Sequence, residues 1–277
     1  MSRWLALIIG NSRLHWANFL ENKIEQSWHT PHLQGEAIAH LVHTQFDFTP
    51  HTTTPPQVSE SAFEELWLAS VDPQQTRLWQ TYLQAHTLDL QQVPLMGMYP
   101  TLGIDRALNV VGAMQLWRPP LLVIDAGTAL TFTGVDTTGT LAGGAILPGV
   151  SSQLQALHHD TAALPWIHPN LNMATALPKR WAHNTPAAIQ SGVLYGILAT
   201  LKDFAEDWWR QYPCSTIALT GGDGQLLLNL LRLDTSQWHD SQWQKSLVWE
   251  PNLMFLGVQF TRHYQLNRSA HPSNSCH

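Results

Sequence analysis

Residues 122–132 read Leu-Val-Ile-Asp-Ala-Gly-Thr-Ala-Leu-Thr-Phe, and this stretch decides the fold. An apolar run, one carboxylate, a Gly-Thr pair and a second apolar run follow one another. This order predicts a buried strand that ends in a tight turn and continues into a second strand. Gly127 allows the turn a positive φ or a close approach of a ligand to the backbone. Asp125, at the mouth of the turn, is suited to orient a metal ion or to accept a proton from an attacking hydroxyl.

The N-terminus repeats this pattern without the acid. Residues 5–12 read Leu-Ala-Leu-Ile-Ile-Gly-Asn-Ser, which again predicts a strand and a glycine turn. The residue two positions before Gly10 is Ile8, where the other turn has Asp125. Taken alone, Gly10-Asn11-Ser12 is compatible with a plain hairpin turn or with a phosphate contact, and the hairpin is the simpler interpretation.

Three strands in meander order are predicted in each half of the chain. They are residues 4–9, 14–19 and 24–28, and residues 121–125, 130–135 and 141–147. The first meander continues as helix, strand, helix and strand, which resembles a ribonuclease-H-like lobe more than a simple alternating β-α fold. The repetition indicates gene duplication. We therefore expect an α/β protein with two ribonuclease-H-like domains, residues 1–117 and 118–265, and a disordered tail, residues 266–277.

Length, charge and cysteine content restrict the class of protein. A chain of 277 residues is long enough for two domains that each bury a core. Its 14 Lys and Arg against 20 Asp and Glu give a net charge of -6, which argues against nucleic acid or an anionic membrane as the main partner. Cys214 and Cys276 lack a metal-binding spacing and predict a reducing compartment without disulfides. We find no apolar run long enough to span a membrane and expect a cytoplasmic protein.

Three further glycine-bearing segments suit a ligand site. Gly103-Ile104-Asp105-Arg106 precedes a helix, where Asp105 can accept from hydroxyls and Arg106 can bind a carboxylate. An N-cap Asp followed by an exposed Arg is equally compatible with this segment. Residues 143–149, Gly-Gly-Ala-Ile-Leu-Pro-Gly, form either an ordinary connection or a loop that admits a ligand to the backbone. Residues 220–224, Thr-Gly-Gly-Asp-Gly, suit an adenosine or phosphate contact, although a tight β-α turn has the same pattern.

Two local predictions concern the elements around these segments. Apolar residues spaced by three or four predict a helix over residues 186–212, with Thr185 as the N-cap and Pro186 as the first helical residue. Residues 91–95 are predicted to form a short strand. His158-His159-Asp160 has no spaced partner for a zinc site. The sequence contains neither a Walker lysine loop nor Gly-x-Gly-x-x-Gly, which disfavours P-loop and Rossmann folds.

Taken together, these segments resemble the type III pantothenate kinases, a family of the acetate-kinase, sugar-kinase, Hsp70 and actin superfamily, and so imply actin-like ATPase domains. The resemblance spans nearly the whole chain and depends on the order of the motifs. The matching segments are Gly103–Arg106, Asp125–Ala129, Gly143–Gly149, Asn184–Thr185 with Gln190–Gly192, and Thr220–Asp223. The resemblance implies transfer of the γ-phosphoryl group of ATP to the primary hydroxyl of pantothenate, the first step toward coenzyme A.

The same resemblance implies roles for individual residues. Asp125 is expected to be the catalytic base and to bind the metal, with Asp105 as a second catalytic residue. The expected pantothenate-binding residues are Gly103, Ile104, Asp105, Arg106 and Thr185. The expected ATP-binding and phosphate-binding residues are Gly10, Asn11, Ser12, Gly127, Thr128, Gly221 and Gly222. The resemblance also implies Mg²⁺, a monovalent cation (K⁺ or NH₄⁺), and a homodimer with the active site at the subunit interface.

Two features depart from the family pattern. The family's first turn usually reads Asp-x-Gly-Asn-Thr, whereas Ile8 replaces the acid here and Ser12 replaces the threonine. A tyrosine usually precedes the Gly-x-Asp-Arg segment; Tyr99 lies closer than that spacing and is assigned no role. Loss of the first acid removes a charge near Mg²⁺, so a non-catalytic nucleotide-binding or ligand-binding regulatory relative is an alternative. A kinase of the same superfamily for another small molecule is a third hypothesis.

Overall fold

The structure is a computed structural model that describes residues 2–52, 63–82, 84–168, 176–233 and 246–270. The chain divides into two compact units, one formed by Met1–Gln115 with Asn252–His277 and the other by Leu116–Pro251. Each unit contains a five-stranded sheet. Within the described ranges, no helix is both long enough and apolar enough to cross a membrane.

The first unit is built on a mixed sheet with the strand order β3-β2-β1-β4-β5. β1 pairs antiparallel with β2 and β2 with β3, as the predicted meander requires, whereas β1 and β4 are parallel, as are β4 and β5. The strands are β1 Arg3–Ile9, β2 Leu14–Leu20, β3 Lys23–Thr30, β4 Glu65–Ser70 and β5 Ala85–Thr87. The α-helices are α1 Gly35–His43, α2 Pro73–Trp79, α3 Ile104–Leu116 and α8 Leu253–Ala270, and the 3-10 helices are η1 Thr49–His51 and η2 Leu90–Gln92.

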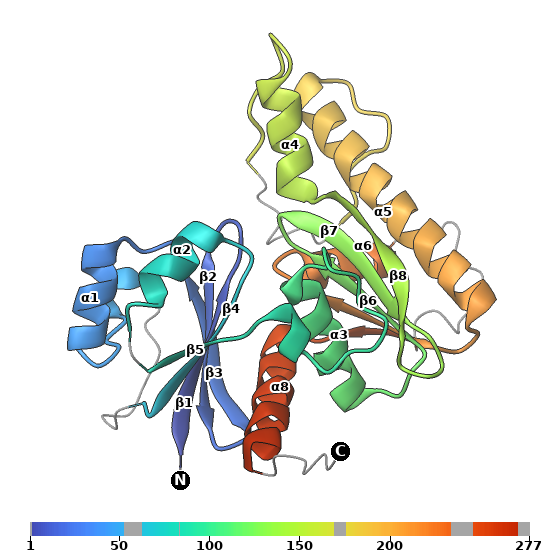
Figure 1. Cartoon of the computed structure of the whole chain (residues 1–277). Coiled ribbons are helices and arrows are strands. Elements are labelled where there is room, and N and C mark those ends of the chain that lie inside the picture. Colours follow the sequence, from blue (N-terminus) through green and yellow to red (C-terminus); the bar gives the residue numbers. More distant parts are fainter. Residues whose placement is uncertain (1, 53–62, 83, 169–175, 234–245, 271–277) are drawn as a thin grey trace. The chain divides into compact units, whose positions relative to one another are not determined.

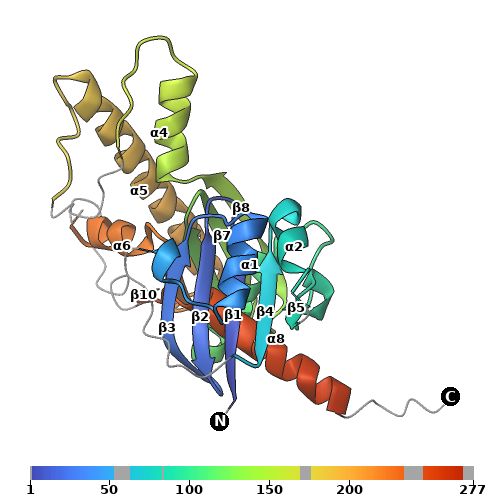
Figure 2. The ribbon, with the colours of Figure 1, turned by 90° about the vertical axis from the view of Figure 1, so that its left-hand side faces the viewer.

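One face of this sheet is covered by α1 and α2 (Figures 1 and 2). Leu5 and Ile9 of β1 join Ile38 of α1 and Trp79 of α2 in one buried hydrophobic cluster. Because side chains alternate between the two faces of a strand, Ile8 projects from the opposite face.

Helix α8 packs on that opposite face, against β1 and β4. Arg262 Nε and Nη2 donate to Glu65 Oε2 at 3.0 and 2.8 Å, and the guanidinium carbon lies 4.8 Å from the Trp4 ring centroid. Burial raises the pKa of Glu65, but hydrogen bonds from Trp67 and Arg262 outweigh it, so the pKa is lowered. The helix is therefore anchored to the first sheet by charge, hydrogen bonding and ring contact together.

The domain limits predicted from the sequence need correction at the C-terminus. Residues 252–265 were assigned to the second domain, but the contacts of α8 place them in the first unit. A Cβ at Gly112 of α3 would lie 1.9 Å from the carbonyl oxygen of Leu253, so the two helix backbones touch within this unit. Residues 266–270, predicted as disordered, continue the helix. Residues 271–277 lie outside the described residues.

The second unit repeats the strand arrangement of the first, with the order β10-β9-β6-β7-β8. β6, β7 and β8 form the antiparallel meander, and β6–β9 and β9–β10 are parallel. The strands are β6 Leu121–Ala126, β7 Ala129–Val135, β8 Leu141–Pro148, β9 Thr216–Thr220 and β10 Leu247–Trp249, and the helices are α4 Val150–His159, α5 Thr185–Gln211 and α6 Gly224–Leu233. Two mixed sheets flanked by helices confirm the predicted fold class.

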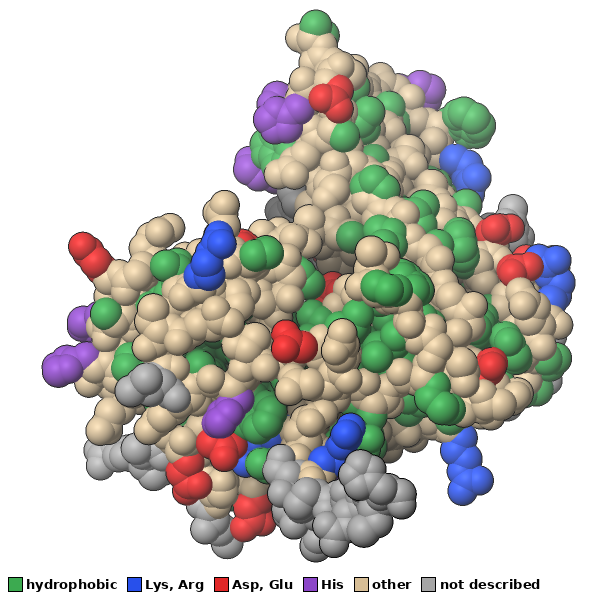
Figure 3. All heavy atoms as spheres, in the orientation of Figure 1, with side chains coloured by type: hydrophobic (Ala, Val, Ile, Leu, Met, Phe, Trp, Pro, Cys, Tyr) green, Lys and Arg blue, Asp and Glu red, His purple; other side chains and the backbone are tan. Residues whose placement is uncertain are grey.

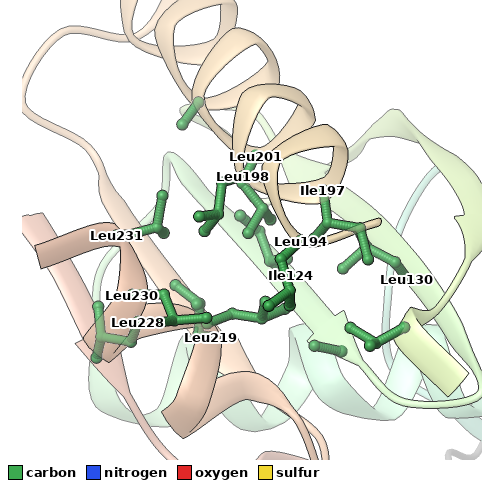
Figure 4. Packing of buried hydrophobic residues seen from close by; sticks show 14 of the residues in the cluster. Ile124, Leu130, Leu194, Ile197, Leu198, Leu201, Leu219, Leu228, Leu230 and Leu231 are labelled. Carbon is green, nitrogen blue, oxygen red and sulfur yellow. The ribbon is translucent and has the colours of Figure 1, made fainter. Parts of the chain in front are cut away.

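A core of leucine and isoleucine side chains packs against β6 (Figure 4). Ile124 of β6 and Leu219 of β9 pack with Leu198 and Leu201 of α5 and Leu228 of α6. Each such side chain contributes about 1.5–3 kcal/mol when fully buried. The strand that carries Asp125 is therefore held firmly on its apolar face.

Two local predictions from the sequence are wrong. Residues 91–95 do not form a strand: Asp89 N donates to Gln92 Oε1 at 2.8 Å and closes the 3-10 turn η2. The N-cap of α5 is Asn184, whose Oδ1 accepts from Ala187 N at 2.9 Å, and Thr185 is the first helical residue. In both cases a side chain that bonds to a local backbone N–H or C=O sets the element boundary.

Candidate functional site

Asp125, the last residue but one of β6, lies between threonines of the two neighbouring strands. It is opposite Thr131 on β7 and beside Thr220 on β9. Paired residues project from the same face of a sheet, so the two threonine side chains flank the carboxylate. Both threonines are buried. The site residues predicted from the sequence do not include Thr131 and Thr220, because only the strand register shows that they lie next to Asp125.

The glycine turns after β6 and β9 meet beside this carboxylate. Asp223 N donates to Ala126 O at 2.9 Å. Gly221 has a φ of +85°, and a Cβ at this position would lie 2.4 Å from Asp125 Oδ1 and 2.5 Å from Ala126 O. Glycine is therefore required at position 221 by backbone conformation and by space. A Cβ at Gly222 would meet no atom within 4 Å.

The backbone of Thr128 is held by the start of α4. Gly149 N donates to Thr128 O at 2.9 Å, and Ser152 Oγ donates to the same oxygen at 2.7 Å. A Cβ at Gly149 would lie 2.0 Å from Gly127 O, so the segment 143–149 brings its last glycine against the turn. The structure thus brings together the predicted residues Asp125, Gly127, Thr128 and Gly221. Ser152 was missed, since a serine in a first helical turn carries no signal of its own.

Thr185 lies elsewhere in the second unit, beside a cavity of about 690 Å³ between α4 and α5. Gln153 and Leu157 of α4 line one side of the cavity, and His183 and Thr185 line the other. Gln153 Nε2 donates to Pro148 O at 2.9 Å, which fixes the α4 side. The cavity is large enough for a small organic molecule. Gln153 and His183 were not predicted, because they adjoin Thr185 only through the packing of the two helices.

In the first unit, the segment 103–106 opens α3 as predicted. Asp105 Oδ1 accepts from Arg106 N at 2.8 Å, and a Cβ at Gly103 would lie 2.4 Å from this oxygen. Arg106 is 5% exposed, and its Nη1 donates to Tyr99 Oη at 2.9 Å. The alternative of an exposed Arg106 is therefore excluded. Tyr99, which received no role from the sequence, positions the guanidinium group.

The glycine turn after β1 is surrounded by basic residues. Gly10 N donates to Arg13 O at 3.1 Å, and His32 Nε2 lies 2.9 Å from Gly10 O. Asn11 and Ser12 are exposed. Ile8, in the place of the usual acid, is only 3% exposed. The three predicted phosphate-binding residues therefore lie together at the end of β1, beside an apolar side chain.

His15 is the residue of this region with the most perturbed pKa. Burial and the positive charges of Arg13 and His29 lower the pKa of His15 to about 4. Burial and Arg13 also lower the pKa of His29. Near neutral pH the His15 imidazole is therefore uncharged. The sequence analysis missed this group, because only strand pairing places these histidines side by side.

The comparisons with known proteins agree on one family. The family model described as type III pantothenate kinase matches residues 4–207. This chain belongs to the type III pantothenate kinase family. It is 44% identical over 271 residues to the type III pantothenate kinase of Nostoc sp. (strain PCC 7120), covering 93% of this chain and 94% of that protein. It is 40% identical over 260 residues to the one of Synechocystis sp. (strain PCC 6803), covering 94% and 90% of the two chains.

Solved structures support the fold of the family member. A protein described as a Baf family transcriptional activator from Campylobacter jejuni has a TM-score of 0.60 and 19% identity, over 95% of this chain and 99% of that one. The activator of 2-hydroxyisocaproyl-CoA dehydratase from Clostridium difficile, with bound ADPNP, has a TM-score of 0.52 and 10% identity, over 99% of both chains. At these identities the likeness concerns the fold alone.

The residues around Asp125 are compatible with a magnesium ion that would be held partly by substrate phosphates. Among the described residues, no group of three or more His, Cys, Asp or Glu side chains could form a protein-only metal cage. Mg²⁺ usually keeps several waters and binds through one or two carboxylates plus substrate phosphates. The carboxylate of Asp125, next to the glycine turns, is a ligand of this kind.

Proposed function

We propose that this chain transfers the γ-phosphoryl group of ATP to the primary hydroxyl of pantothenate, the first step toward coenzyme A. Membership of the type III pantothenate kinase family supports the choice of substrates. The observation that carries the proposal is Asp125, a carboxylate held beside two glycine turns on a strand that is paired on both sides and buried on its apolar face. Phosphoryl transfer requires mainly positioning and charge neutralisation, which this arrangement suits.

Asp125 is the catalytic base in this proposal. A carboxylate within hydrogen-bond reach of the substrate hydroxyl accepts its proton as the phosphoryl group is transferred. Gly127 and Gly221 leave the backbone accessible to phosphate oxygens, and Thr128 adds a hydroxyl. Gly222, with open space around it, adjoins the adenosine. Gly10, Asn11 and Ser12 bind phosphate from the first unit.

Pantothenate recognition is assigned to the segment 103–106 and to Thr185. Pantothenate carries one carboxylate and two hydroxyls, and a planar guanidinium group binds a carboxylate through two parallel hydrogen bonds. Arg106 is held by Tyr99, so its guanidinium loses little conformational freedom when substrate binds. Asp105 accepts from a substrate hydroxyl and is the second catalytic residue; Thr185 contributes a hydroxyl beside its cavity.

Cations and subunit organisation complete the proposal. Mg²⁺, held by Asp125, would neutralise charge on the transferred phosphoryl group. A monovalent cation, K⁺ or NH₄⁺, and a cytoplasmic homodimer with the active site at the subunit interface follow from the family resemblance. Light scattering at assay concentration tests the dimer: a mass of twice 31.1 kDa is expected, and a monomer that turns over at full rate contradicts it.

The decisive experiment measures ADP release by the purified full chain with ATP, Mg²⁺ and K⁺, with and without pantothenate. We expect release that depends on pantothenate and a phosphorylated product detected by mass spectrometry. ATP binding without release under any cation would favour the regulatory alternative. ADP release with another hydroxyl acid or polyol but not with pantothenate would favour a different small-molecule kinase.

A further inference from the structure

The segment that precedes α5, residues 178–184, folds back along the helix and is bonded to it at two points. Ser191 Oγ donates to Arg180 O at 2.8 Å. Tyr195 Oη donates to Pro178 O at 2.9 Å. The two donors are four residues apart, so they lie on one face of α5 and are separated by a rise of about 6 Å. Two residues of extended chain cover nearly the same length, so each hydroxyl meets one carbonyl oxygen of the segment.

A third contact strengthens the same arrangement. The guanidinium carbon of Arg180 lies 4.2 Å from the centroid of the Tyr195 ring, within the range of a cation–π interaction. Ser191 is 3% exposed, and a buried hydroxyl is stable only when it is hydrogen-bonded. Both observations favour the bound position of the segment. We refer to Arg180, Ser191 and Tyr195 together as the α5 clamp.

The α5 clamp and the helix cap fix the two ends of a short run that lines the cavity between α4 and α5. The clamp holds Arg180, and four residues later Asn184 caps the helix by accepting from a backbone N–H. Ala182 and His183 lie between these two fixed points. Both line the cavity, as do Asn184 and Thr185. Among the described residues that line the cavity, none belongs to the clamp, so the clamp can act on a ligand there only through the residues that it holds.

We propose that Arg180, Ser191 and Tyr195 are positioning residues for pantothenate, which hold segment 178–184 and with it the cavity wall beside Thr185. The inference rests on the proposed function, which assigns Thr185 to pantothenate. A wall that is ordered before the substrate arrives lowers the entropy cost of binding. Asp125 is supported instead by leucine and isoleucine side chains of the core. Loss of the clamp is therefore expected to raise KM for pantothenate and to leave kcat and KM for ATP unchanged.

Steady-state kinetics of the full chain tests the effect on substrate. Ser191→Ala and Tyr195→Phe each remove one hydroxyl and should raise KM for pantothenate about threefold to tenfold, the range of one neutral hydrogen bond. Ser191→Thr keeps a hydroxyl and should retain the wild-type KM. Thr200→Ala and Tyr212→Phe are matched controls and should change neither constant. Thr200 Oγ1 donates within the helix, to Gly196 O, and Tyr212 is the C-cap of α5.

Limited digestion with trypsin reports the position of the segment without any turnover. Lys179 and Arg180 are exposed, and the sequence contains no other Lys or Arg between Arg118 and Lys202. Cleavage after either residue therefore gives fragments that mass spectrometry identifies. Because the rate of cleavage follows the population of the opened segment, the two hydroxyl-deletion variants of the clamp should be cleaved there about threefold to tenfold faster. The two control variants should be cleaved at the wild-type rate.

A variant of the third clamp residue covers the case in which Ser191→Ala fails to fold. Arg180→Gln removes the ring contact and keeps both hydrogen bonds, and Arg180 is exposed. It should raise KM for pantothenate about twofold to fivefold, the range of an exposed cation–π contact. Together with Tyr195→Phe, it then decides the question.

The outcomes separate this proposal from the proposed function. A wild-type KM for pantothenate in the clamp variants would overturn the positioning role and leave the kinase assignment intact. A loss of kcat without a change in KM, or equal effects in the control variants, would also overturn it. If the wild-type chain neither binds nor phosphorylates pantothenate, both proposals are wrong.

Discussion

The turns that follow β1 and β6 occupy equivalent places in two sheets of the same strand order, yet their chemistry is opposite. At the second turn, Asp125 stands between Thr131 and Thr220. At the first, Ile8 stands between His15 and Ala69. One row therefore carries a carboxylate with hydroxyls, and the other carries imidazole beside a guanidinium.

In our proposed function, the two units of equal strand order have different tasks. The strand, the glycine two residues after the key position, and the pairing with one antiparallel and one parallel neighbour strand are the same in both units. The residue at the key position differs: a buried isoleucine stands one residue before the end of β1, and an aspartate stands one residue before the end of β6. In our proposal, the second turn carries the catalytic base and the first turn binds phosphate.

Our proposal gives no catalytic role to the histidines on the surface of α4 and of the loop that follows it. Figure 3 shows histidine side chains gathered over α4 and the loop that follows it. The ring centroids of His158 and His159 are 5.4 Å apart, and Trp166 Nε1 donates to His168 Nδ1 at 3.2 Å. His158 Nδ1 lies 3.0 Å from Leu164 O, and the ring centroids of His158 and Trp166 are 5.8 Å apart, so the loop contacts the end of the helix. His158 and His159 are the last two residues of α4.

The largest effect is expected from removing the acid of the second turn. Asp125→Asn should lower kcat about 10²-fold to 10⁴-fold, because the proton acceptor is lost while the shape of the side chain is kept. ADP release at saturating ATP and pantothenate measures it. Asp136→Asn, in the turn between β7 and β8, is the control and should retain activity. Full activity of Asp125→Asn would remove the distinction between the two turns.

Adding an acid to the first turn should destabilise the protein. Ile8 is 3% exposed, so Ile8→Asp should lower the free energy of unfolding by about 3–5 kcal/mol at pH 8. The loss should shrink toward pH 6, because the new carboxylate raises the pKa of His15 and pairs with its protonated form. Urea denaturation at several pH values measures both effects. Ile8→Asn should show a loss that does not change with pH; the same behaviour in Ile8→Asp would contradict the pairing.

The glycines of the second turn should differ sharply from each other. Gly221→Ala should cost about 3 kcal/mol, because a positive φ and the contacts of the new Cβ with Asp125 and Ala126 both oppose it. Gly222→Ala should change stability by less than about 0.5 kcal/mol, since its Cβ meets nothing within 4 Å. Thermal unfolding of the pair provides the comparison. Equal shifts in Tm would show that the turn is not tightly packed.

The smallest effect concerns the pH dependence of stability at the first turn. The pKa of His15 is lowered from 6.5 to about 4, so the unfolded chain binds more protons between these values. Stability should therefore be full above pH 6.5 and fall by about 2 kcal/mol by pH 5. His15→Gln should flatten this slope relative to wild type, whereas His43→Gln should not. Parallel slopes in all three chains would mean that His15 titrates normally.

Much of the fold followed from local pattern. Apolar runs and glycine turns located both meanders, and periodicity located α5, because each signal is contained within one element. The strand predicted at residues 91–95 was wrong, since the hydrogen bond between Asp89 and Gln92 closes a turn there. Helix α8 was assigned to the wrong unit, because its packing on β1 and β4 depends on residues far away in the chain.

The candidate site was predictable to the extent that it consists of contiguous motifs. Asp125, Gly127, Thr128 and Gly221 were identified in this way, and the structure brings them together. Thr220 belongs to a quoted segment, but only the strand register shows that it and Thr131 lie beside Asp125, and the role of Ser152 required the packing of α4. Arg106 could be read as exposed or as buried until its contact with Tyr99 was known.

By itself, the sequence determined the duplicated strand-turn pattern, the family and the contrast between Asp125 and Ile8, because these depend on residue identity and order along the chain. The tertiary structure alone decided which side chains stand beside those two positions. Strand pairing places threonines next to Asp125 and histidines next to Ile8. The environment that shifts the pKa of His15 arises from burial and from charges brought close by folding, and neither exists in the extended chain.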